Sequence, residues 1–66
     1  MTREEILMKS AAQLQKTARS IAESNMVGDR LWVSTNEDAI LVANDKAEHD
    51  EMVVLAAALL VMARPA

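Results

Sequence analysis

The feature that most constrains this chain is a run of twelve consecutive apolar residues, 52–63, with the sequence MVVLAAALLVMA. As an α-helix rising about 1.5 Å per residue, the run would be about 18 Å long, well short of the ~30 Å hydrocarbon core of a bilayer. Charged residues precede the run, and Arg64 and Pro65 follow it, so it cannot be extended into a membrane span. Its leucines, alanines and methionines favour a helix over a strand. Pro65 is expected to stop that helix, with Arg64 near its negative end.

The predicted C-terminal helix is apolar on every side, and such a helix is normally buried all round. A chain of 66 residues has too few other side chains to cover such a helix on every side, since a domain of that size buries only about 60% of its unfolded surface. There is also no cysteine to supply a disulfide. We therefore expect one face to pack on the chain itself and another on a second copy, in a homodimer or higher oligomer. The predicted self-association residues are Met52, Leu55, Ala56, Leu59, Leu60 and Met62. The alternative is a monomer whose alanine face stays partly exposed.

The N-terminal third predicts an amphipathic helix over about residues 3–25. Thr2 and Glu5 form a capping box at its start. Large and small apolar residues then alternate along one side of it, in a stripe that contains Leu7, Ala11, Leu14, Ala18 and Ile21. Gly28 is expected to terminate the helix, because glycine readily adopts the left-handed conformation there.

The middle of the chain allows two interpretations. Residues 30–34 and 39–43 are short apolar segments separated by a polar stretch at 35–38, which favours a β-hairpin over about 30–43. Alternatively, Ser34 and Glu37 form a capping box that could begin one helix running from residue 35 to 63. Residues 44–51 decide between them, since only Ala47 is apolar there and a helix would have almost nothing to bury. We therefore expect a separate helix over about 46–63, capped by Asn44 or Asp45.

These elements predict a single α+β domain over residues 1–66, a small helix–hairpin–helix (αββα) assembled as a helical homodimer. The alternative fold is an all-α two-helix hairpin. Charge is distributed unevenly along the chain, whose net charge is −3. The N-terminal helix carries a basic face, made of Lys9, Lys16 and Arg19, whereas acidic residues dominate 37–51. That basic face is a possible nucleic-acid surface, but the acidic balance and the lack of a known motif speak against nucleic acid as the partner.

No residue of the chain stands out as catalytic or metal-binding. His49 is the only histidine, and Asp45 four residues earlier could join it on one helix face. Zinc sites need three or four protein ligands, so we expect neither a metal nor a cofactor. The carboxylates of Glu48, Asp50 and Glu51 lie close in sequence, but nothing nearby supplies a nucleophile. The chain is therefore expected not to be an enzyme.

Trp32 is the only aromatic residue, and it lies next to Leu31 and two positions from Arg30. Alternation along a strand would place Leu31 and Val33 on one face and Trp32 on the other. Trp32 is then either the largest core side chain or an exposed anchor for a partner, since tryptophan and arginine are enriched in binding hot spots. The predicted partner-binding residues are Arg30, Trp32, Glu48, His49 and Glu51.

Together these features predict a small cytoplasmic, oligomeric, non-enzymatic accessory protein of the regulator or inhibitor type. It would act by binding a macromolecular partner, most simply another protein, and would not enter a membrane. The acidic residues Glu4 and Glu5 near the start give no indication of a secretory signal. Two alternatives remain: a dimeric DNA-binding regulator that uses the basic face, and a binder of a small ligand in a cavity between subunits.

Overall fold

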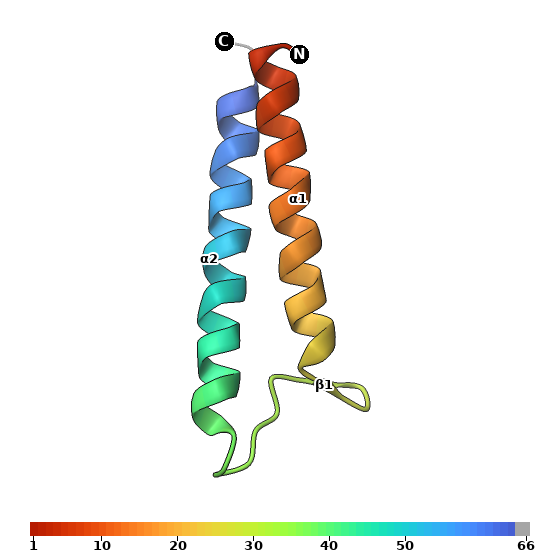
Figure 1. Cartoon of the computed structure of the whole chain (residues 1–66), viewed down its shortest axis with the longest axis vertical. Coiled ribbons are helices and arrows are strands. Elements are labelled where there is room, and N and C mark those ends of the chain that lie inside the picture. Colours follow the sequence, from red (N-terminus) through yellow and green to blue (C-terminus); the bar gives the residue numbers. More distant parts are fainter. Residues whose placement is uncertain (65–66) are drawn as a thin grey trace.

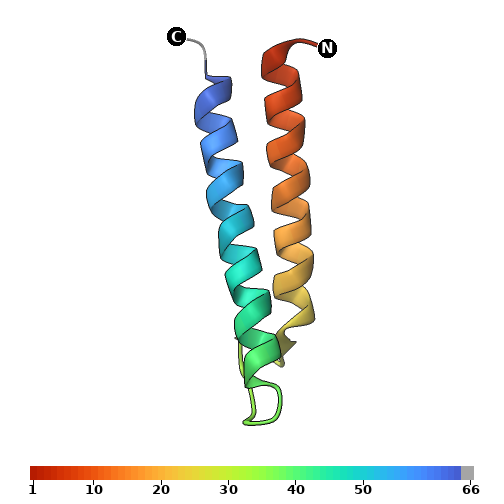
Figure 2. The same cartoon turned by 60° about the vertical axis from the view of Figure 1, so that its left-hand side comes forward.

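The computed structural model describes residues 1–64, which form a hairpin of two long helices. Helix α1 spans Arg3–Ser24 and helix α2 spans Ala39–Ala63; the connection contains the short strands β1 (Met26–Val27) and β2 (Arg30–Leu31). The helices run antiparallel, with the start of α1 and the end of α2 at one extremity and the strands at the other (Figure 1). The second view shows the same side-by-side arrangement (Figure 2). The molecule is a rod of 47 × 18 × 16 Å. Two long helices and a short antiparallel strand pair are thus confirmed.

Helix α1 begins with the predicted cap. The hydroxyl of Thr2 accepts a hydrogen bond from the backbone N–H of Glu5 at 3.2 Å, and the acids Glu4 and Glu5 lie in the first turn. Both features stabilise the positive end of the helix dipole. The helix ends at Ser24, where the backbone N–H of Asn25 donates to the carbonyl of Ala22 at 3.0 Å.

The β-hairpin lies earlier in the chain than the sequence predicts. Met26 pairs with Leu31 and Val27 with Arg30 in an antiparallel ladder. Gly28 has a φ of +64° at the first position of the two-residue turn, which is the arrangement of a type II′ turn. The predicted hairpin over 30–43 is therefore wrong. Gly28 does take the left-handed conformation, but it turns the hairpin rather than ending α1.

Helix α2 begins at Ala39 rather than near residue 46, so residues 39–43 are helical and not a strand. In the turn before it, the carboxylate of Asp38 accepts hydrogen bonds from the backbone N–H of Thr35 at 2.6 Å and from its hydroxyl at 2.9 Å. At the other end Arg64 is extended, with φ −67° and ψ 138°, as expected of a residue before proline. Pro65 lies outside the described residues.

Each helix contacts the other through one row of covered residues, which we call its covered stripe. The positions in each covered stripe are spaced alternately three and four residues apart, the spacing of a coiled coil. The covered stripe of α1 and its end is Leu7, Ala11, Leu14, Ala18, Ile21 and Asn25. That of α2 is Val42, Asp45, His49, Met52, Ala56, Leu59 and Ala63. Among residues 1–64 the fully covered apolar residues are alanines: Ala11, Ala18, Ala56 and Ala63. Such small side chains allow the two axes to approach toward the short end of the usual ~8–10 Å range.

The loop end of this contact is polar, which explains why residues 44–51 are helical. The side-chain amide of Asn25 donates to the carboxylate of Asp45 at 3.1 Å and to the carbonyl of Ile21 at 2.9 Å. His49 lies against Trp32 one turn further along α2. The expectation that this segment has nothing to bury is wrong, because its inward side chains find polar and aromatic partners. At the opposite end the guanidinium of Arg3 donates to the carbonyl of Met62 at 3.3 Å.

The burial of alanines between the helices leads to a first prediction. Ala18 is only 2% exposed, so Ala18→Leu should force the helices apart and lower the free energy of unfolding by about 1–3 kcal/mol. Urea unfolding at a fixed protein concentration measures this change. The matched control is Ala12→Leu on the exposed side of the same helix, expected to stay within about 0.5 kcal/mol. Equal losses in both variants would contradict the close approach of the helices.

Candidate functional site

The outward side of α2 is the most conspicuous surface of the molecule, because it is apolar and uncovered. Helix α1 covers only one side of the apolar run. The large apolar side chains of α2 that remain exposed, by 36% to 76% of their area, are Ile40, Leu41, Val53, Val54, Leu55, Leu60, Val61 and Met62. Surfaces of this kind mark interaction sites in soluble proteins. A single hairpin therefore hides one face of α2 and leaves the other to water.

The structure divides the predicted self-association residues into two groups. Met52, Ala56 and Leu59 lie on the covered stripe and pack toward α1. Leu55, Leu60 and Met62 are exposed by 46%, 36% and 52%. Only the second group is free to contact another molecule, and contact between copies of the chain stays a prediction.

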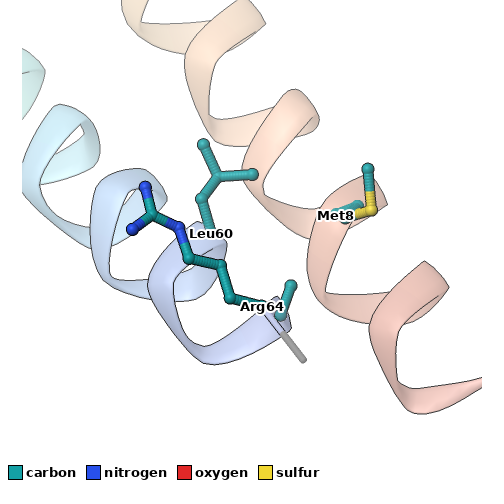
Figure 3. Close-up of a pocket in the computed structure, with 4 residues that line it drawn as sticks. Met8, Leu60 and Arg64 are labelled. Carbon is teal, nitrogen blue, oxygen red and sulfur yellow. The ribbon is translucent and has the colours of Figure 1, made fainter. Parts of the chain in front are cut away.

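An open groove adjoins this surface near the ends of the chain. It has a volume of about 390 Å³ and is lined by Met8, Leu60, Ala63 and Arg64. Figure 3 shows Met8 on one helix and Leu60 with Arg64 on the other. The volume falls within the ~300–1,000 Å³ of small-ligand pockets, but the groove is open along the side of the rod. We therefore interpret the groove as one edge of the apolar surface of α2.

At the loop end the structure brings together two predicted partner-binding residues. The rings of Trp32 and His49 meet edge to face, with centroids 5.1 Å apart and planes at 63°. Trp32 has a φ of 62°, and its backbone N–H donates to the carbonyl of Asn25 at 3.2 Å. It follows β2 rather than lying within it, so the predicted strand alternation does not apply. Half-buried, Trp32 closes the loop end of the helix pair while leaving part of its surface open.

The other three predicted partner-binding residues are exposed. Arg30 is exposed on β2, and Glu48 and Glu51 are exposed on α2. His49 Nδ1 lies 3.0 Å from a carboxylate oxygen of Asp50, whose second oxygen accepts from the Lys46 ammonium at 2.8 Å. The hydrogen bond from Lys46, followed by the one with His49, lowers the pKa of Asp50. These groups make the surface of α2 around His49 polar and acidic.

The basic face of α1 is exposed along the helix. Lys9, Lys16 and Arg19 are all solvent-accessible. They are spaced by seven and three residues, so they share one side of the helix. The covered stripe lies elsewhere on α1, so this face is free for contact with another molecule.

Asn25, which caps α1, and Asp45 on α2 form the one hydrogen bond between two side chains that joins the two arms of the hairpin within residues 1–64. The contact between Asn25 and Asp45 is not among the predictions from the sequence. The spacing could have indicated it, because Asn25 continues the alternating spacing of the α1 stripe and Asp45 that of α2. Both residues are polar, however, and the predicted helix–helix contact was assigned to apolar residues.

Residues 1–64 contain no cluster of three or more histidine, aspartate or glutamate side chains placed to hold a metal ion. Within the same range, neither helix is both long enough and apolar enough to cross a bilayer. Comparisons of the chain with protein-family models, curated proteins and solved structures found no match.

A second prediction concerns the ring contact. His49→Ala removes the partner of Trp32, so the tryptophan should become more exposed and its fluorescence should shift to longer wavelength. Emission spectra and quenching by acrylamide measure the change. Glu48→Ala, which truncates an exposed neighbour on the same helix, is the matched control and should leave the spectrum unchanged. Identical spectra for wild type and His49→Ala would contradict the contact.

A third prediction concerns the loss of folding stability at low pH. The backbone N–H of Thr35, followed by its hydroxyl, lowers the pKa of Asp38 below its ordinary value of 3.8. Because the pKa is lower in the folded state, the stabilisation is complete above the unfolded pKa and is lost as pH falls through the folded pKa. Urea unfolding between about pH 6 and about pH 2 should therefore lose less stability in Asp38→Asn than in wild type. Glu37→Gln is the matched control, and an acid response of Asp38→Asn identical to that of wild type would contradict this role.

Proposed function

We propose that this chain is a small, non-enzymatic accessory protein that assembles with further copies of itself and acts by binding a partner protein. The observation that supports this most directly is the row of large apolar side chains left exposed along α2. An uncovered apolar helix face of this length is unfavourable in water and is normally covered by another chain. We also propose a cytoplasmic location, where a chain without cysteine needs no oxidising surroundings.

Self-association follows from the small amount of apolar surface that one hairpin hides. The fully covered apolar residues of the described part of the chain are alanines, which contribute little burial. Small scaffolds without disulfides or metals commonly gain the missing stability from oligomerisation. Antiparallel helix pairs do so by forming bundles of four helices.

The loop end supplies the best surface for a partner protein. Trp32 is half-buried and Arg30 is exposed beside it, and both residue types are enriched among binding hot spots. The exposed acids Glu48 and Glu51 lie further along α2. This combination suits a partner with a basic rim around an apolar pocket, because opposite charges steer the encounter.

A fourth prediction tests self-association. Light scattering or sedimentation of the purified chain at micromolar concentration should give at least twice the mass of one chain, decreasing on dilution. A clean monomer at every concentration up to the millimolar range would remove the self-association part of the proposal.

Partner binding is tested separately, by capture from host lysate. The wild-type chain should retain a protein that the charge-reversed variant Arg30→Glu/Glu51→Lys does not. Gln13→Ala, on the exposed side of α1, is the matched control and should retain it. Equal capture by all three chains would move the partner surface away from the loop end, and no capture by any would count against a protein partner.

The exposed basic face keeps a second candidate function open, that of a dimeric DNA-binding regulator. Lys9, Lys16 and Arg19 would contact phosphates, so affinity for DNA should fall steeply with salt. Lys9→Glu/Lys16→Glu should abolish that binding. Weak binding that is insensitive to these changes would exclude this function.

A further inference from the structure

Helix α2 carries a second stripe on the side turned away from α1. We call it the outer stripe; it consists of Ile40, Ala43, Ala47, Asp50, Val54, Ala57 and Val61. Its positions are spaced alternately three and four residues apart, as in the covered stripe, and every member is exposed. An alternating spacing of this kind is what packs one helix along another.

The composition of the outer stripe also suits a second helix. Ala43, Ala47 and Ala57 would allow a close approach like that between α1 and α2. Six of the seven residues are apolar, and the exception is Asp50. The outward side of α1 differs, because it carries the basic face and Gln13. Helix α2 thus has two sides that can pack against another helix, whereas α1 has one.

We propose that the outer stripe packs antiparallel against the same stripe of a second copy, about a twofold axis. The result is a four-helix assembly with the two α2 helices inside and the two α1 helices outside. This inference rests on the proposed self-association and names the surface that performs it. A twofold interface uses the same patch on both copies, which a single repeated stripe provides.

The charges of α2 select the antiparallel orientation. Its first half contains Asp45, Glu48, Asp50 and Glu51 against Lys46, whereas residues 52–63 carry no charge. Parallel helices would place the two acidic halves side by side, where like charges repel. Antiparallel helices instead place Asp45 and Glu48 beside the uncharged half of the other copy, with opposed helix dipoles, so that only Asp50 and Glu51 lie near their own counterparts at the twofold axis.

The outer stripe is long enough to run along a second helix, and a stable dimer would use its flanks as well. A stable interface buries about 800 Å² on each partner, roughly a sixth of the 5113 Å² of this chain. From Ile40 to Val61 the stripe is about 32 Å long on a helix about 10–12 Å wide. Val53 and Leu60, exposed by 46% and 36%, extend the contact toward the groove beside Met8.

Asp50 is the member of the outer stripe that opposes assembly. Its carboxylate holds Lys46 at 2.8 Å and His49 at 3.0 Å, so part of its charge is already balanced. Moving it between two helices still removes water from a charged group. A neutral side chain at this position should therefore tighten the dimer.

Dimer dissociation constants from sedimentation equilibrium test the proposal. Val54→Asp places a charge in each copy of the interface and should weaken the dimer by ~100-fold or more. Asp50→Ala should tighten it several-fold. Gln13→Asp introduces the same charge on the exposed side of α1 and should leave the constant unchanged. Val54 is 66% exposed in the single hairpin, so far-UV circular dichroism should show the variant still helical.

The chain contains no cysteine, so single cysteines can report the orientation. An equimolar mixture of Ile40→Cys and Val61→Cys chains should cross-link between the two variants, because those positions approach each other only when the helices are antiparallel. Efficient cross-linking of Val61→Cys alone would instead indicate a parallel pair and overturn the proposal. If wild type is a dimer that Val54→Asp leaves intact, the outer stripe is not the interface, although self-association stands. A monomeric wild type would remove both.

Discussion

The alanines buried between α1 and α2 determine most of what this molecule can be. Ala11 and Ala18 on α1 and Ala56 and Ala63 on α2 lie in the covered stripes, and these are the apolar residues that the hairpin covers almost completely. Small side chains bring the helices near each other but remove little apolar surface from water. The same feature that makes the hairpin narrow therefore leaves the large apolar side chains of α2 outside it. The hydrophobic core of a single hairpin is therefore incomplete because alanines form the helix–helix contact.

The two ends of the rod differ in chemistry. Near the chain ends the contact is apolar, and Arg3 donates to a carbonyl in the last turn of α2. Near the loop, Asn25 bonds Asp45, and Trp32 packs on His49. Polar pairs of this kind are directional, so they fix which positions of the two helices lie level with each other. The surface proposed for a partner lies beside these polar pairs.

The asymmetry between the helices connects the fold with the proposed function. Helix α1 has one apolar side and a basic outer face, as expected of an outer helix in a bundle. Helix α2 has two apolar sides, as expected of an inner one. If two copies join through the outer stripe, the basic faces and the loop ends remain on the surface. Assembly would then use the outer stripe, and partner binding the loop end together with the exposed acids that lie beside that stripe.

The sequence alone determined the first helix, the need to cover the apolar run and the left-handed conformation of Gly28, because capping, periodicity and glycine conformation are local properties. It did not determine whether residues 39–43 form a strand or a helix, since a five-residue apolar run fits both. The helical state of residues 44–51 was decided only by tertiary structure. The partners of Asp45 and His49 are Asn25 and Trp32, which lie far away in the chain. A polar segment can form a helix–helix contact only when the fold places partners for its side chains next to it, and those partners cannot be identified from the local sequence.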